Sequence, residues 1–429
     1  MNIRINEKIS IEADIPFQSI QELAMTWEIN DHARVNMSGI LKGKEGVNQI
    51  LFEDYLRGTV RLIMTGNKDN EADETLFCGQ IEQIDLKYTH GVLLALVTAV
   101  SASINLDKKQ HCYTFQDTSQ TYAETAKAVN ALEDVSIICS IGDKKLEKPV
   151  ICYQETAWEF EKRLASLQHS YIIPDILTGR PNLWFGMRKG KEINKNSSTV
   201  EVRIRKSYVD GERGRAVISH SLESRGSYLL GDWMMLNGRK CVIYKKEFLL
   251  KHADIQFVYW LANEKDLETE PCYNERFNGL CLSGTVEKTR NETVQVKFDI
   301  DGKSGKYFYP WRPDSGNALY AMPEKGSKAE VYFMNHDERQ AIVIRCLHNL
   351  KNKDKEPGDK YFETSDASIG LSGGSIEMVK SEASMKLRDK SSIGFDGENL
   401  TIEGDGKIKM TARHIKLSAS TVIKAVTGM

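Results

Sequence analysis

The stretch that decides the fold is residues 375–418, SIEMVKSEASMKLRDKSSIGFDGENLTIEGDGKIKMTARHIKLS. Six pairs of the form apolar-x-apolar stand in it among polar residues, and their first members are 9, 8, 7, 8 and 7 residues apart. A period of two is typical of a β-strand with one buried face. The pairs are Ile376/Met378, Met385/Leu387, Ile393/Phe395, Leu400/Ile402, Ile408/Met410 and Ile415/Leu417.

Each of these strands is too short and too narrow to form a core alone, so such repeats become stable by stacking. A repeat of about eight residues covers about one face, whereas a single-chain solenoid must cover three faces in each turn. We therefore expect three chains to form a triangular β-prism with the twelve apolar residues on its axis. With about 4.8 Å between strands, six strands per face would make it on the order of 30 Å long. The alternative is a flexible or aggregation-prone segment.

The whole chain has 429 residues, more than one hydrophobic core usually holds, so two to four domains are expected. Lysine and arginine number 58 against 60 aspartate and glutamate, which gives a net charge of -2. This balance provides no general attraction to phosphate or to anionic lipid. Nucleic acid is therefore not an expected partner.

The cysteines and the N-terminus indicate where the chain is made. The eight cysteines are scattered, with no Cys-x-x-Cys and no Cys/His cluster at zinc spacing, so we expect reduced thiols and no metal or other cofactor. The first residues, MNIRINEKISIEADIPF, are charged and alternating, unlike a secretory signal, and no apolar run approaches the roughly 20 residues that span a bilayer. We expect synthesis in the cytosol, with any later export by another route.

Residues 1–262 alternate runs of β-branched and apolar residues with glycine and polar breaks. This pattern predicts two β-rich units joined through helices. Helices are expected near residues 121–133 and 156–168, each starting with a capping box in which a threonine precedes a glutamate by three residues. These pairs are Thr121/Glu124 and Thr156/Glu159.

Residues 275–348 form the next predicted domain. Their apolar runs suggest about five short strands in some seventy residues, which is typical of a small closed barrel of the oligonucleotide/oligosaccharide-binding (OB) type. Polar stretches precede and follow this barrel, NEKDLETEPCYNERF and HNLKNKDKEPGDKYF. Residues 362–429 then form the predicted triple-stranded β-helix spike.

Two pairs of carboxylates could indicate chemistry. Glu155 and Glu159 lie four residues apart at a helix start, where helix capping and a solvated face are better explanations than acid/base catalysis. Asp299 and Asp301 lie in FDIDGK, which lacks the further ligands of an EF-hand loop and is better explained as an Asp-Gly turn. No catalytic, cofactor-binding or metal-binding residue is predicted.

Other residues have structural explanations as well. The aromatic residues Tyr307, Phe308, Tyr309 and Trp311 could stack on bases, but we expect them in the barrel core or between chains. We expect Gly370, Gly373 and Gly374 to form the turn that enters the prism, because no Gly-Lys-Ser/Thr follows them. His414 precedes an inward-facing pair, so alternation places it on the surface.

Three stretches resemble a known family. They are SINLDKKQHCYTFQDTSQTYAET (103–125), YQETAWEFEKRLAS (153–166), and YPWRPDSGNALYAMPEKGSKAEVYF with HDERQAIVI (309–344). In this order, before a narrow β-prism, they resemble the spike of contractile injection systems, known in type VI secretion as the valine-glycine repeat protein G (VgrG) family. The chain also resembles a myophage baseplate hub fused to its puncturing device. The tail lacks valine-glycine dipeptides, which favours a phage-tail-like or divergent particle.

The resemblance implies a mainly β fold with barrel-like hub units, an OB barrel and a trimeric C-terminal prism. It implies a homotrimeric, non-enzymatic spike that connects the inner tube and baseplate proteins to the puncturing tip and is ejected on contraction. Alternatives are a phage or prophage tail hub, or a glycan-binding or enzymatic module trimerised by a β-prism stalk. By the family's example, effectors and a tip protein of the proline-alanine-alanine-arginine (PAAR) type are further partners, the tip contacting Val422, Ile423, Val426 and Met429.

Overall fold

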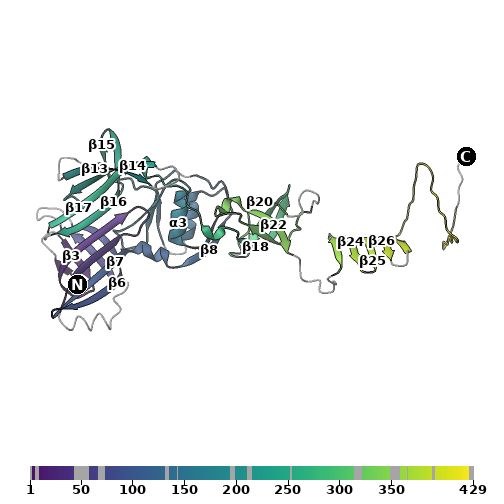
Figure 1. The fold of residues 1–429 in the computed structure, drawn as a ribbon, viewed down its shortest axis with the longest axis horizontal. Helices are drawn as coiled ribbons and strands as arrows, with labels where there is room; N and C mark the ends of the chain where they lie inside the picture. Colours follow the sequence, from purple (N-terminus) through teal and green to yellow (C-terminus); the bar gives the residue numbers. More distant parts are fainter. Residues whose placement is uncertain are drawn as a thin grey trace. The chain divides into compact units, whose positions relative to one another are not determined.

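The computed structural model describes residues 2–4, 9–42, 58–65, 73–130, 135–142, 144–193, 199–209, 215–251, 254–313, 321–347, 358–364, 366–388 and 392–424. The chain divides into two compact units, Met1–His348 and Asn349–Met429. Strands predominate in the described residues (Figure 1). The predicted mainly β class is confirmed.

A twelve-stranded antiparallel sheet forms the body of the first unit, which we call the sheet body. Its order is β1-β2-β5-β6-β7-β4-β3-β16-β17-β14-β13, with β15 paired to β16. The strands of its first half are β1 (Asn2–Arg4), β2 (Ile9–Ala13), β3 (Phe17–Glu28), β4 (Arg34–Leu41), β5 (Thr59–Met64), β6 (Glu74–Thr89) and β7 (Val92–Ser101). Those of its second half are β13 (Thr199–Val209), β14 (Arg215–Ser224), β15 (Trp233–Leu236), β16 (Arg239–Lys251) and β17 (Asp254–Asn263).

The two halves are continuous, because β3 pairs with β16 from Glu28↔Lys245 to Ala24↔Leu249. Alternate residues of these strands are apolar, so one face of the sheet is buried. A single core cluster draws side chains from both halves, among them Trp27, Val97 and Phe257. The two predicted hub units therefore share one sheet and one core.

An insert, residues 102–193, separates the halves in sequence and has a core of its own. Helices α2 (Tyr122–Asn130) and α3 (Ala157–Ser166) pack together in it. Two small sheets accompany them, β10-β8 and β11-β12-β9. The remaining elements are η1 (Ala102–Asp107), β8 (Gln110–Phe115), β9 (Ile137–Cys139), β10 (Val150–Thr156), β11 (Ile172–Pro174) and β12 (Leu183–Phe185).

Both predicted helix starts are confirmed. Glu159 N donates to Thr156 Oγ1 at 3.1 Å and Thr156 N donates to Glu159 Oε2 at 2.9 Å, a complete capping box. Thr121 and Glu124 make the same reciprocal bonds at 3.1 and 2.9 Å. The apolar stripe of α3 then lies in the core of the insert.

The barrel, residues 281–347, follows a connection that contains η2 (Glu264–Leu267) and η3 (Glu275–Phe277). Its five strands have the order β20-β19-β18-β21-β22, and a parallel bridge between Trp311 and Val343 joins the end of β20 to β22. The sheet thus closes on itself around Val296, Phe298 and Val331. The elements are β18 (Cys281–Arg290), β19 (Thr293–Phe298), β20 (Phe308–Pro310), β21 (Lys328–Tyr332), η4 (Glu338–Gln340) and β22 (Ile342–Leu347).

The second unit, which we call the tail, is an antiparallel meander of five strands in chain order. Gly373 and Gly374 form the turn between its second and third strands, as expected, whereas Gly370 lies inside a strand and is not part of that turn. Residues 397–424 form no helix or strand. The strands are β23 (Lys360–Glu363), β24 (Ala367–Ser372), β25 (Ser375–Lys380), β26 (Ala383–Arg388) and β27 (Ser392–Asp396).

Candidate functional site

The tail presents one apolar face across four strands. Leu371 pairs with Ile376, Ile376 with Leu387, and Leu387 with Ile393. Because directly opposite residues point to the same side of a sheet, these side chains form one row. A second row contains Ile369, Met378, Met385 and Phe395, and we call the two rows together the apolar tail face.

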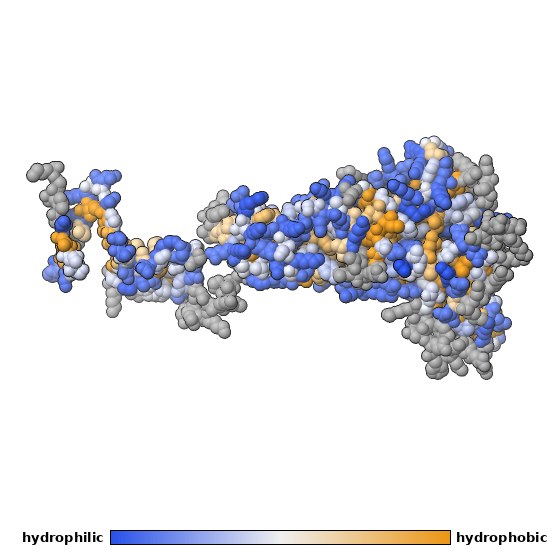
Figure 2. Space-filling view, turned by 180° about the vertical axis from the view of Figure 1, so that it is seen from behind, coloured by the Kyte–Doolittle hydropathy of each residue, from blue (hydrophilic) through white to orange (hydrophobic). Residues whose placement is uncertain are grey.

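The apolar tail face lies at the surface of the single chain. Ile376 is 43% exposed, Ile393 is 61% exposed and Phe395 is 57% exposed, whereas Met385 and Leu387 are half-buried. Figure 2 shows hydrophobic and hydrophilic residues side by side on the tail. The pair Ile369/Leu371 was not predicted from the sequence, although Ile369 precedes Ile376 by the same seven residues that separate later pairs.

The last three predicted pairs lie in residues 397–424, where the single chain forms none of the three strands expected there. All six side chains are more than half exposed in the single chain, which alone cannot bury them on a three-fold axis. The exposed fractions are 65% for Leu400, 63% for Ile402, 51% for Ile408, 67% for Met410, 54% for Ile415 and 67% for Leu417. A strand requires neighbours for its backbone hydrogen bonds, and one copy of the tail supplies none to these residues.

The predicted tip residues are only partly described. Val422 and Ile423 are exposed, and Val426 and Met429 lie outside the described residues. His414 is exposed, but Ile415 and Leu417 are exposed as well, so its place on the outside of the prism stays a prediction. The axis and tip assignments therefore stay predictions, on side chains that are available for contact.

A second cluster lies where α3 meets the barrel. Arg163 Nε and Nη2 donate to the two carboxylate oxygens of Glu155 at 2.7 and 2.8 Å, and Nη1 donates to Glu338 Oε1 at 2.5 Å. The side chains of all three residues are at most 5% exposed. Burial by itself would lower the pKa of Arg163, but attraction to Glu338 and Glu155 raises it overall. The predicted solvated-face role is wrong for Glu155, because the carboxylate is buried in this ion cluster.

The three stretches that carry the family resemblance converge here. Asp107, from the first stretch, accepts a hydrogen bond at 2.5 Å from Thr156, from the second. Arg163, also from the second, binds Glu338 of the third. These motif residues therefore hold η1, α3 and the barrel together.

The same region brings together a serine, a histidine and an aspartate. Ser103 Oγ lies 2.8 Å from His32 Nδ1, and His32 Nε2 lies 3.5 Å from Asp107 Oδ2. Ser103 is fully buried, and the His32 ring lies 4.1 Å from the Trp158 ring. Burial lowers the pKa of His32 despite its bond to Asp107. A nucleophile must reach its substrate, so we interpret this arrangement as a buried polar support for the insert.

The aromatic residues of the barrel are mostly structural. Tyr309 lies in the core, as expected, with Tyr307 packed edge-on at 5.0 Å between ring centroids. Phe308 lies under the Arg290 guanidinium at 5.1 Å, and Trp311 Nε1 donates to Ala321 O at 3.0 Å. Tyr307 and Trp311 are also partly buried against the core of the barrel.

The two aspartates of FDIDGK serve structural contacts. Asp299 accepts a bond from Lys328 Nζ at 2.6 Å. Asp301 accepts bonds from Thr114 N and Oγ1 of the insert at 2.6 and 2.7 Å. Gly302 has a φ of +63°, so the expected turn is present. Within the described residues, no group of three or more His, Cys, Asp or Glu side chains is placed to hold a metal ion.

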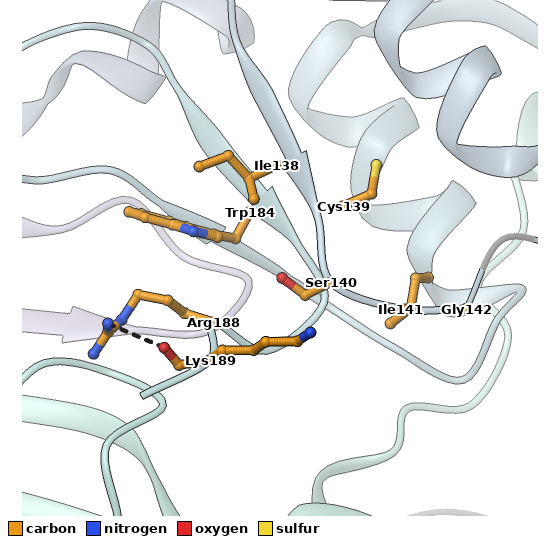
Figure 3. A pocket seen from close by; sticks show the side chains of 8 residues that line it. All are labelled: Ile138, Cys139, Ser140, Ile141, Gly142, Trp184, Arg188 and Lys189. Carbon is orange, nitrogen blue, oxygen red and sulfur yellow. Dashed lines mark hydrogen bonds between the residues drawn. The ribbon is translucent and has the colours of Figure 1, made fainter. Parts of the chain in front are cut away.

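A pocket of about 520 Å³ lies beside β9 and β12. Figure 3 shows Ile138 and Trp184 close together on one side of it, with Arg188 and Lys189 on another. The Arg188 guanidinium donates to Leu230 O at 2.9 Å and to Asp232 Oδ1 at 2.6 Å. Among its described lining residues, no histidine or carboxylate is present to activate a nucleophile. Its lining residues are Ile138, Cys139, Ser140, Ile141, Gly142, Trp184, Arg188 and Lys189.

All eight cysteines are free thiols. No helix in the described ranges is long and apolar enough to cross a membrane.

Comparison with known proteins identifies the fold. No protein-family model and no curated protein matches the sequence. One similar structure is the Escherichia coli c3393 protein, which is described as a type VI secretion component similar in structure to the T4 bacteriophage tail proteins gp27 and gp5. Its sequence is 11% identical to this one, and the TM-score is 0.52 over 79% of this chain and 99% of that one. A chain of the half-lidded Francisella PdpA-VgrG complex is 10% identical with a TM-score of 0.55, over 90% of this chain and 87% of that one.

At this level of identity the comparison defines the fold. The match to the Francisella complex covers 90% of this chain in one alignment. The chain has a VgrG-like hub fold of the kind found in type VI secretion and phage-tail proteins, as the resemblance implies.

Proposed function

We propose that the protein is a homotrimeric hub and spike at the tip of a contractile injection particle. The VgrG-like fold supports an injection particle as the class of assembly. The apolar tail face is the main observation that supports a trimer. Three copies of that face, turned toward one axis, bury side chains that a single chain leaves in contact with water. The sheet body contacts the inner tube and baseplate, and the tail extends toward the target envelope.

Burial of the tail contributes to the driving force for association. Complete burial of a Leu, Ile, Met or Phe side chain contributes about 1.5–3 kcal/mol. The twelve predicted axis residues of one chain are roughly half exposed, so their burial would contribute on the order of 10 kcal/mol per chain before the entropy of ordering is subtracted. The same burial gives residues 397–424 the neighbours that they need to form strands.

The barrel and the tip complete the proposed assembly. The strand order and parallel closure of the barrel support its assignment as an OB fold. We assign it the role of spacer between sheet body and spike, with no nucleic acid bound. Val422 and Ile423 are exposed at the end of the described tail, and we assign them to contact with a separate PAAR-type tip protein.

The proposed mechanism is mechanical and breaks no covalent bond. Sheath contraction drives the tube, and a stiff prism concentrates the force on a small area of envelope. The burial of Ser103 argues against a catalytic triad of Ser103, His32 and Asp107. We propose synthesis in the cytosol, assembly into the particle, and ejection on contraction.

The oligomeric state tests this proposal. Light scattering should give three times the chain mass of 48.6 kDa. Tagged and untagged chains produced together should give four species by native mass spectrometry, in a ratio of about 1:3:3:1, as expected for random trimers. Two species would mean monomers and three would mean dimers, and either result would overturn the trimeric spike.

An alternative function has the same fold in a different particle. A phage or prophage tail hub shares the proposed architecture, and genes for sheath and tube next to this one would distinguish it from a secretion system. A glycan-binding or enzymatic module on a trimeric stalk would use the pocket beside β9. Glycan-array binding that is lost on Trp184→Ala would support that module.

A further inference from the structure

One stretch of chain, residues 268–280, leads from the sheet body into the barrel, and the insert holds it at three points. Thr269 Oγ1 donates to Ser170 O at 2.6 Å, and Cys272 N donates to Ser166 Oγ at 2.8 Å. Asn274 Nδ2 donates to Tyr153 O at 2.9 Å. The connection therefore follows the end of α3 and β10.

Arg163 joins the insert directly to the barrel, beside this connection. Three of its hydrogen bonds stay within the insert, two to Glu155 and one from Nη2 to Ile151 O at 2.8 Å. The fourth, from Nη1, reaches Glu338 in η4 of the barrel, 175 residues further along the chain. One planar guanidinium is thus fixed by the insert and directed at the barrel.

Two further contacts flank Arg163. Ile151 of β10 is 1% exposed and belongs to the core cluster of the barrel. Asp301, in the loop after β19, accepts both bonds from Thr114 of β8. Figure 1 shows α3 and β8 between the sheet body and the barrel. The barrel is therefore held through η4, its core and the loop after β19.

We call the contacts between the insert and the barrel the joint. Its buried charges are better suited to orienting the barrel than to stabilising it. A buried ion cluster is often no more stabilising than apolar residues of the same volume, because desolvation offsets the attraction. Apolar contacts tolerate small rotations, whereas hydrogen bonds to a charged group weaken steeply as their angles change. A joint built on Arg163 therefore resists rotation of the barrel more than an apolar joint of equal strength.

We propose that Arg163 is a positioning residue that fixes the angle of the barrel against the hub through Glu338. This inference rests on the proposed function, in which an axial load passes from the sheet body to the spike. Bending at residues 268–280 would divert that load. The Arg163–Glu338 bond keeps the hub and the barrel in line while the load is applied.

Hydrogen exchange measured by mass spectrometry on the full chain tests this role. Glu338→Ala removes the barrel's half of the bond but leaves the Arg163–Glu155 pair intact. We expect amide exchange in residues 268–280 and in η4 to become roughly ten- to a hundred-fold faster, because a hydrogen bond to a charged group is lost. Exchange in β3 and β16 of the sheet body should not change.

Two variants act as controls. Glu338→Gln keeps an oxygen that can accept from Arg163, so it should restore much of the protection that Glu338→Ala loses. Lys306→Gln removes an exposed ion pair with Asp117 that joins the same two parts. We expect it to change exchange by no more than roughly five-fold, because exposed pairs contribute little.

The possible results test the positioning role of Arg163 separately from the proposed function. Unchanged exchange at residues 268–280 in Glu338→Ala would overturn the positioning role. Faster exchange throughout the sheet body and barrel would also overturn it, because that result means a general loss of stability. A monomeric mass for the unmodified protein would overturn the trimeric spike, whereas the exchange comparison would still decide the role of Arg163.

Discussion

Lys246 carries a charge in the core of the sheet body. It lies on β16 and is fully buried, with its ammonium 4.9 Å from the centre of the Phe257 ring and 3.1 Å from Ser227 Oγ. Burial lowers the pKa of this lysine to about 8, and attraction to Glu74 and Asp232 offsets only part of that effect. The amine is therefore mostly charged at neutral pH, inside an aromatic setting that partly compensates for lost water.

Stability should rise in alkali because of Lys246. The pKa in the folded chain, about 8, lies below that of an exposed lysine, about 10.4, so the unfolded chain binds the proton more tightly between these values. The free energy of unfolding should therefore increase from about pH 8 to pH 10.4, by at most about 3 kcal/mol. Urea unfolding of Lys246→Met should lack this increase and show greater stability at pH 7.

Lys245→Met is the matched control for that experiment. Lys245 is the preceding residue on β16, but its ammonium is partly exposed and pairs with Glu247 and Glu28 at 3.1 and 3.4 Å. The variant should keep the alkaline increase in stability. An unchanged pH profile in Lys246→Met would contradict the assignment.

The start of α3 combines a local signal with distant contacts. Its capping box is visible in the sequence because Thr156 and Glu159 are three residues apart, and the structure confirms it. The partners of the same helix in other stretches are not visible there. Asp107 lies 49 residues before Thr156, and Glu338 lies 175 residues after Arg163. Only the tertiary fold brings those charges to α3, which is why the sequence alone placed Glu155 in solvent.

Removing the two helix caps should have unequal effects. Thr121→Ala removes an exposed capping box and should cost about 1 kcal/mol of stability. Thr156→Ala removes a capping box together with the hydrogen bond to Asp107, so its cost should be about 2–3 kcal/mol. Thermal unfolding of the two variants side by side measures the difference. Equal losses would mean that the Asp107 bond contributes nothing.

The tail shows what an apolar repeat can and cannot specify. Period-two pairs predicted the strands β25, β26 and β27 and the face on which their side chains lie. The pairs that begin at Leu400, Ile408 and Ile415 have the same pattern, yet residues 397–424 form no strand in the single chain. A strand requires neighbours for its backbone hydrogen bonds, and a pattern does not state which chain provides them.

At the scale of the whole molecule, local patterns predicted the mainly β class and the order hub, barrel and tail. They did not predict that β3 pairs with β16, because that pairing joins residues more than two hundred positions apart, Thr26 and Glu247 among them. Nor did they predict that the resemblance motifs meet around α3. Pairings of this kind depend on tertiary packing, and the shared core of the sheet body is the result.

Assembly of the whole molecule should depend on the inward-facing residues of the tail. Ile408→Asp with Met410→Asp would place three copies of each charge on the proposed axis, where burial without a partner costs several kcal/mol per charge. We expect this double variant to give monomers by light scattering, while hydrogen exchange in the sheet body and barrel stays unchanged. Lys407→Glu with Lys409→Glu is the control, because alternation turns these side chains outward. It adds the same number of acidic residues to the same strand and should leave the trimer intact. A trimer with normal melting in the aspartate variant would show that the axis runs along the other face, and loss of assembly in both variants would show that net charge, rather than burial, controls it.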